Sequence, residues 1–200
     1  MRDNYNRESY LDLEFKKQYI SMMIPSLRKE GEDEEVKAAK KRYAGLVKEN
    51  GKEELELTGL EGIRGDWTEA AGDFQKELLL KVFKKQEVEV FIKSYVKELL
   101  SGNLDGKLVY RKSIRKNLNE YTKTTPPHVK AARKLDSIEG NIIEYYITTD
   151  GPEPIQKLKH KLDYEHYIDK QIKPIANQIL GLFGKNFDDI VKGSKQKKLF

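Results

Sequence analysis

The spacing of apolar residues changes near residue 65, and this change most constrains what the chain can fold into. In residues 11–16 and 54–57, apolar side chains alternate with charged ones, as in half-buried β-strands. From Asp66 onward they recur every three or four positions, as along one face of a helix: Trp67, Ala70, Ala71, Phe74, Leu78 and Val82. We therefore predict an α+β chain, with a β-rich first part followed by a mainly helical part that contains a small β element.

Short-range signals in the first part place a turn and a helix start. Asn50-Gly51 lies between two strand-like runs and predicts a hairpin. The acidic run 28–37, around Gly31, is typical of a flexible connection between strands. Asp66, followed three residues later by Glu69, resembles a capping box and predicts that the first helix begins there.

Further signals divide the remainder of the chain. A second helix, with Tyr95 on its apolar face, should end at Ser101-Gly102, and Pro126-Pro127 can start a short helix. The β-branched and aromatic residues of 142–149 predict a strand.

A last long helix is predicted after Asp163, whose side chain can cap it. Pro174 lies inside this helix and should kink it, because proline has no backbone N–H. Gly184 is the expected end of the helix.

Composition limits the class of protein. Lys and Arg number 38 against 33 Asp and Glu, which gives a net charge of +5, compatible with a polyanionic partner without identifying one. The chain has no cysteine, which excludes disulfides and thiolate metal sites. Neither a membrane-length apolar run nor a signal peptide is visible, so we expect no membrane partner and a cytoplasmic protein.

Known catalytic motifs are missing from the sequence. It contains no phosphate-binding GxxxxGK[ST] loop, no GxSxG elbow and no HExxH, and its three histidines lack metal-ligand spacing. With 33 acidic residues, chance carboxylate pairs are unavoidable. We therefore assign no catalytic residue and no metal ligand.

Basic clusters that include aromatic residues are more informative. They are 40–43 (Lys-Lys-Arg-Tyr), 108–116 (with Tyr110 among four cations) and 128–134. Cations of this kind bind phosphates, and tyrosine can stack on a sugar or hydrogen-bond to a base edge. A solvated charged surface is the alternative interpretation of the same residues.

Several segments resemble one family in collinear order. Residues 40–45 (KKRYAG) are similar to the segment that follows the catalytic strand in family B DNA polymerases, and residues 59–68 (GLEGIRGDWT) to the segment leading from palm to thumb. Residues 108–112, 126–133, 149–154 and 163–174 resemble later segments, most closely those of the bacterial DNA polymerase II group. Together these matches extend over nearly the whole chain.

The resemblance implies an organisation into three parts: the C-terminal part of a palm (1–65), a thumb (66–192) and a flexible clamp-binding tail (193–200). The chain would then be the C-terminal fragment of a DNA-directed DNA polymerase, nucleoid-associated in the cytoplasm, that grips primer–template DNA and docks on the sliding clamp. The aspartates that hold Mg²⁺ in such a polymerase would precede it, so the chain alone should need no cofactor and copy no DNA. The alternative is an independent, non-enzymatic nucleic-acid-binding or adaptor module.

The resemblance and the basic clusters together give the expected contacts. Within the family segment of 40–45, the Lys-x-Tyr part contacts the duplex, here Lys41 and Tyr43. The DNA-binding set is Lys40, Lys41, Arg42, Tyr43, Arg64, Tyr110, Arg111, Lys112, Arg115, Lys116, His128, Lys130, Arg133 and Lys134. The tail resembles a clamp-docking peptide, in which Gln196, Leu199 and Phe200 would contact the clamp.

Overall fold

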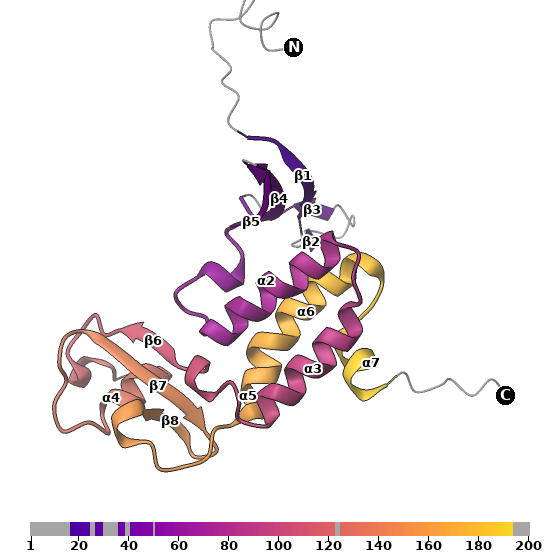
Figure 1. Cartoon of the computed structure of the whole chain (residues 1–200). Helices are drawn as coiled ribbons and strands as arrows, with labels where there is room; N and C mark the ends of the chain where they lie inside the picture. Colours follow the sequence, from indigo (N-terminus) through magenta and orange to yellow (C-terminus); the bar gives the residue numbers. More distant parts are fainter. Residues whose placement is uncertain are drawn as a thin grey trace, which may run out of the picture.

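The computed structural model describes residues 17–24, 27–29, 36–38, 41–49, 51–122 and 125–193. Three small antiparallel sheets are combined with a group of packed helices (Figure 1). This arrangement confirms the α+β class predicted from the sequence. None of the helices in these ranges is long and apolar enough to cross a membrane.

A three-stranded sheet lies at one end of the helices. Its strands are β1 (Tyr19–Met23), β4 (Tyr43–Glu49) and β5 (Lys52–Thr58), in the order β1-β4-β5. The predicted hairpin is confirmed: β4 and β5 pair throughout, and Gly51 adopts a φ of +79° between them. The predicted strand at 11–16 lies outside the described residues.

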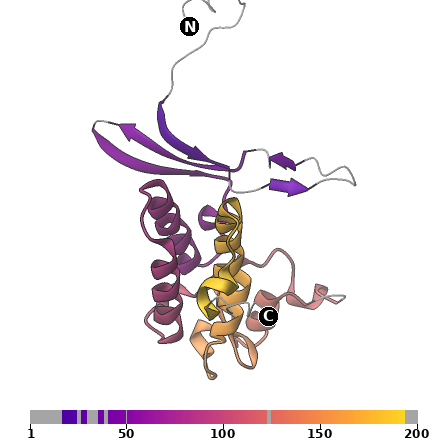
Figure 2. The same cartoon turned by 90° about the vertical axis from the view of Figure 1, so that its right-hand side faces the viewer.

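Two short strands pair at the ends of the acidic run 28–37, a feature that the sequence did not predict. They are β2 (Leu27–Lys29) and β3 (Val36–Ala38). Figure 2 shows this hairpin and the β4–β5 hairpin extending to opposite sides above the helices. The paired residues are Leu27 with Ala38, Arg28 with Lys37 and Lys29 with Val36.

The helical part is built from α2 (Glu69–Phe83), α3 (Val88–Leu100), α6 (Lys173–Leu180) and α7 (Phe187–Lys192). α2 packs against α3 and α6, and α3 packs against α7. Their apolar faces form one core whose fully buried members include Phe74, Leu78, Ile92, Leu99, Ile175 and Ile179. α3 ends as predicted, with Ser101 as its C-cap and Gly102 at a φ of +82°.

The N-cap of α2 is Thr68, not Asp66. The Thr68 hydroxyl accepts a hydrogen bond from the backbone N–H of Ala71 at 3.3 Å, whereas Asp66 pairs with Arg64. Buried Gln171 also hydrogen-bonds to the Thr68 hydroxyl and accepts the Thr68 backbone N–H at 3.3 Å. A tertiary partner therefore selects the position at which the helix begins.

The last long helix begins as predicted, because the Asp163 carboxylate accepts the backbone N–H of His166 at 3.0 Å. It runs through α5 (Tyr164–Tyr167), a π-helical turn (Ile168–Ile172) and α6. The π turn ends just before Pro174, which lies in the first turn of α6 and has no backbone N–H. The kink expected near Pro174 stays a prediction. Gly184, at a φ of +65°, ends the helical run.

A second lobe consists of β6 (Tyr110–Ser113), β7 (Ile142–Thr148) and β8 (Gly151–Pro154), in that order, with α4 (Pro127–Ala132) on one face. We call residues 108–162 the β lobe. The predicted strand at 142–149 and the proline-initiated helix are both confirmed. A small core of Ala131, Ala132, Ile143 and Tyr145 holds α4 on the sheet.

Short 3-10 turns connect these elements. They lie at Glu61–Ile63, Asp105–Lys107, Leu118–Glu120, Ile155–Lys157 and Gly181–Phe183. The first of them leads from the three-stranded sheet into α2, and the β lobe lies at the far end of the helices from that sheet (Figure 1).

Replacing Thr68 with Val tests the buried cap. The change removes the acceptor for the Ala71 N–H and leaves the Gln171 amide without its hydroxyl partner. We expect the free energy of unfolding to fall by about 1–2 kcal/mol in urea unfolding. Exposed Thr122→Val is the matched control and should change it by less than about 0.5 kcal/mol. Equal effects of the two variants would contradict the assigned cap.

Candidate nucleic-acid interface

Strand alternation divides the basic cluster of the β lobe between two faces. Lys112 pairs with Ile143 across the β6–β7 ladder and Arg111 pairs with Glu144, so neighbouring cations point in opposite directions. Ile143 is buried under α4, which places Lys112 on the α4 side. Arg111 lies on the other face, where its Nε is 2.6 Å from Glu144 Oε1.

Among the predicted contact residues of the β lobe, four are exposed cations whose side chains form neither an ion pair nor a hydrogen bond with any described residue: Lys112, Arg115, Lys116 and Lys130. They come from β6, the loop that follows it and α4. We call these four residues the basic patch. Exposed cations without an acidic neighbour are available to bind phosphates.

His128 lies beside the basic patch. Its ring meets Tyr121 edge-on, with ring centroids 6.4 Å apart. Burial and the charge of nearby Lys112 lower the pKa of His128. The imidazole is therefore neutral at pH 7 and offers one donor and one acceptor for hydrogen bonds.

Other predicted contact residues of the lobe have structural partners. The Arg133 guanidinium donates to the carbonyl oxygens of Leu118 at 2.9 Å and Tyr121 at 3.2 Å, which holds the loop following the patch. Lys134 Nζ lies 3.4 Å from the carboxylate of buried Glu153. Both side chains hold the lobe together.

Tyr110 is a packing residue. Its ring stacks between Tyr145, at a centroid distance of 5.3 Å, and Tyr167, at 5.6 Å. Its hydroxyl lies 3.0 Å from His166 Nε2, and burial raises the pKa of Tyr110. The structure therefore places this predicted DNA contact inside the junction between the lobe and the helices.

The second predicted group lies at the start of β4. Lys41 is exposed with a φ of +58°, and Tyr43 is half-buried. Arg42 forms a partly buried ion pair with Glu61, and Arg64 binds both carboxylate oxygens of Asp66 at 3.0 and 2.8 Å. Lys40 and the tail residues Gln196, Leu199 and Phe200 lie outside the described residues.

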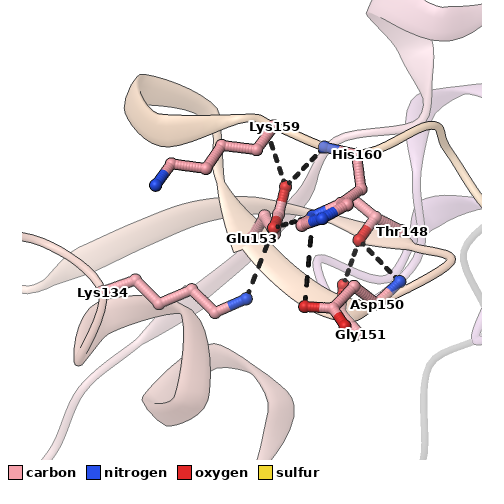
Figure 3. Close-up of polar contacts among 7 residues, drawn as sticks. All are labelled: Lys134, Thr148, Asp150, Gly151, Glu153, Lys159 and His160. Carbon is pink, nitrogen blue, oxygen red and sulfur yellow. Dashed lines mark hydrogen bonds and ion pairs between the residues drawn. The ribbon is translucent and has the colours of Figure 1, made fainter.

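Sequence reasoning missed a polar cluster around Glu153 (Figure 3). The Glu153 side chain is 2% exposed, and its Oε2 accepts the backbone N–H groups of Lys159 at 2.8 Å and His160 at 3.1 Å. Its Oε1 lies 2.7 Å from His160 Nδ1. Burial opposes ionisation, but these bonds outweigh it and lower the pKa of Glu153 to about 2. A lone glutamate seven residues before a histidine gave no signal of this cluster.

The same cluster is the only potential metal-binding group among the described residues. Ligand atoms of Asp150, Glu153 and His160 lie within 4.8 Å of one another. Both carboxylate oxygens of Glu153 are already hydrogen-bonded to nitrogen donors of Lys159 and His160. The carboxylate therefore holds the loop that contains these two residues, and neither oxygen is left to bind a cation. Mg²⁺ prefers oxygen ligands and keeps several waters, so these residues do not fit it.

Comparison with known proteins identifies one family. The family model for DNA polymerase family B matches residues 11–181 of this chain. The chain is 38% identical to DNA polymerase II of Escherichia coli over 92% of its own length, and 30% identical to DNA polymerase 2 of Aeropyrum pernix over 80%. It spans 24% and 22% of those two relatives.

A solved structure shows the same fold. The family B DNA polymerase from Pyrobaculum calidifontis superposes with a TM-score of 0.69 at 23% identity. The match covers 93% of this chain and 24% of that one.

Replacing Glu153 with Gln should destabilise the β lobe in a pH-dependent manner. The folded-state pKa of about 2 lies below the ordinary value of 4.5, so the carboxylate contributes stability above pH 4.5 that is lost as the pH falls towards 2. We expect the variant to lose about 1–3 kcal/mol at pH 7, because it leaves buried donors poorly matched, and less at pH 3.

Urea unfolding at both pH values provides the measurement. Exposed Glu139→Gln is the matched control and should have little effect at either pH. A Glu153→Gln deficit that is as large at pH 3 as at pH 7 would contradict the ionised, anchored carboxylate.

Proposed function

Because this chain belongs to DNA polymerase family B, we propose that it forms part of a DNA-directed DNA polymerase, in which it grips the primer–template duplex. The family resemblance predicted from the sequence is thereby confirmed. The basic patch carries the proposal for duplex binding, because these four predicted contact residues are exposed cations whose side chains have no ion-pair or hydrogen-bond partner among the described residues.

We assign residues 1–65 to the end of the palm, 66–192 to the thumb and 193–200 to a tail. The change from strands to helices between Thr58 and Glu69 supports the first boundary. In this assignment, Lys41 and Tyr43 contact the duplex from the palm, and the basic patch contacts it from the thumb.

The grip is electrostatic and independent of base sequence. Lysine and arginine neutralise phosphates and release condensed counterions, so affinity falls steeply with salt. Phosphate contacts fix the position of the duplex without reading its bases, which suits a protein that must move along DNA. Neutral His128 and Tyr121 add hydrogen bonds and an aromatic surface beside the patch.

Family B polymerases use divalent metal ions, which stabilise the attacking and leaving oxygens of phosphoryl transfer. The Asp150–Glu153–His160 cluster does not fit this role. We propose that the metal-binding carboxylates belong to another part of the polymerase, and that this chain alone binds duplex without extending a primer.

Removing one cation of the basic patch tests the grip. Lys112→Ala and Arg115→Ala should each weaken binding of the chain to primer–template DNA. Each should also reduce the slope of log K against log salt concentration by about 0.9. The loss should be the same for duplexes of different sequence, because phosphates are the ligand.

Fluorescence anisotropy across a salt series measures both quantities. Lys97→Ala, on the exposed side of α3, is the matched control and should leave them unchanged. If all three variants bind like the parent chain, the basic patch is a solvated surface and the thumb grip is wrong.

We also propose that the tail docks on a sliding clamp. Its sequence supports this: Leu199 and Phe200 can fill an apolar pocket, and Gln196 can hydrogen-bond at the pocket edge. Docking of this kind would keep the polymerase near its template between binding events.

Deleting Leu199 and Phe200 tests clamp docking. We expect the deletion to abolish retention of the chain on immobilised clamp and to leave duplex affinity unchanged, because the anchor and the basic patch are separate. Lys195→Ala is the control and should be retained. Equal retention of the full chain and the deletion variant would exclude the tail as the anchor.

A further inference from the structure

Strand β5 has one edge that pairs with no other strand in the part of the chain that the structure describes. The strand order is β1-β4-β5, and β5 pairs with β4 along its whole length. In an antiparallel strand, the backbone N–H and C=O groups point alternately to the two sides, so those on the outer side of β5 are open to a further strand. Such an edge can bind an extended peptide through backbone hydrogen bonds.

An apolar groove lies between β5 and α2. It has a volume of about 210 Å³ and is lined by Leu55 and Leu57 from β5, Ile63 from the turn before α2, and Lys76 and Leu80 from α2. Ile63 is 50% exposed, and the two leucines of β5 are only partly buried. These leucines are two residues apart, so they lie on the same face of the sheet. A strand added beside β5 would place every second side chain on this face, where apolar groups would fill the groove.

The opposite face of β5 is acidic. Glu54 and Glu56 alternate with the two leucines, so their side chains lie on the face away from the groove. Glu56 is paired with Lys17 at 2.5 Å, whereas Glu53 and Glu54 are exposed and form no ion pair with a described residue. Carboxylates at this edge repel the phosphates of a duplex and attract cationic side chains. The edge therefore fits a basic protein segment and not DNA.

We propose that the β5 edge is a docking site for an extended segment of a partner protein in which apolar and basic residues alternate. The segment adds a fourth strand to the sheet. Its backbone pairs with β5, its apolar side chains enter the groove against Ile63 and Leu80, and its lysines or arginines lie beside Glu54. This inference is independent of the proposed DNA contacts, because β5 contributes none of them.

Titration of the ¹⁵N-labelled chain with synthetic peptides tests the proposal. The probe is the capped peptide Lys-Val-Lys-Val-Lys-Val-Lys, which should shift the backbone amide signals of β5 and leave those of β1 and α3 unchanged. Glu-Val-Glu-Val-Glu-Val-Glu keeps the alternation but reverses the charge, and Lys-Lys-Val-Val-Val-Lys-Lys keeps the composition but loses the alternation. Both control peptides should bind at least about fivefold more weakly, because neither forms all the cross-strand contacts.

N-methylation of the probe tests the backbone pairing. In an added strand, the N–H groups of one alternate set of residues face β5 and those of the other set face away. Methylating one set should abolish binding, and methylating the other set should leave it unchanged. Equal effects of the two methylated peptides would show contact without strand addition and would overturn the proposal.

Two exposed positions of the chain test the groove and the charge. Ile63→Ser should weaken binding of the Lys-Val probe about fivefold or more, because it removes an apolar wall of the groove. Glu54→Lys should also weaken it and should strengthen binding of the Glu-Val peptide. Val90→Ser and Glu98→Lys make the same changes at exposed positions of α3, so these matched controls should bind like the parent chain.

Unchanged amide signals of α3 and the β lobe verify that each variant is folded. If the Lys-Val probe shifts no amide signal of β5, or if Ile63→Ser and Glu54→Lys both bind it like the parent chain, the β5 edge is a solvated strand and the proposal is wrong. Shifts confined to β1, at the other edge of the same sheet, would also overturn it.

Discussion

The burial of Tyr167 at the junction between the helices and the β lobe determines where the lobe is held. Its side chain is fully buried, and its ring stacks on Tyr110 of β6 at 5.6 Å. Its hydroxyl accepts the backbone N–H of Ile147 in β7 at 2.8 Å. One helical side chain thus contacts two strands of the lobe, by stacking on one and by hydrogen-bonding to the backbone of the other.

The π turn that follows Tyr167 extends this connection towards the other end of the molecule. It carries Gln171, whose amide meets Thr68 at the start of α2. Next to that start, Gly62 in the turn before α2 donates its backbone N–H to the Gln75 side-chain oxygen at 2.6 Å. The Gly62 carbonyl lies so close to α2 that a Cβ atom at Gly72 would be only 2.7 Å from the carbonyl oxygen. Packed contacts therefore link the β lobe, with its basic patch, to the sheet that carries Tyr43.

Local sequence signals predicted the elements of this structure well. Asn-Gly at the hairpin, Gly102 after α3, Pro127 in the first turn of α4 and Asp163 at the last helix each act on their own neighbours, so one sequence is enough to recognise them. Thr68 was missed as a cap because its selecting partner, Gln171, lies 103 residues away.

The candidate site was less predictable for the same reason. A cluster of cations in sequence says nothing about which of them meet an acid in the fold: Arg42 finds Glu61, and Lys134 finds Glu153. Strand alternation then separates Arg111 from Lys112. In the sequence, Tyr110 looks like a surface aromatic residue beside cations, but in the fold its ring stacks on buried Tyr167.

Hydrogen–deuterium exchange of the full chain, with and without primer–template DNA, tests the central claim most directly. The account predicts slower exchange on DNA binding at 41–43, in the loop 114–122 and at the start of α4, with residues 89–97 of α3 unchanged. Protection confined to α3, with the β lobe exchanging as in the free chain, would contradict it.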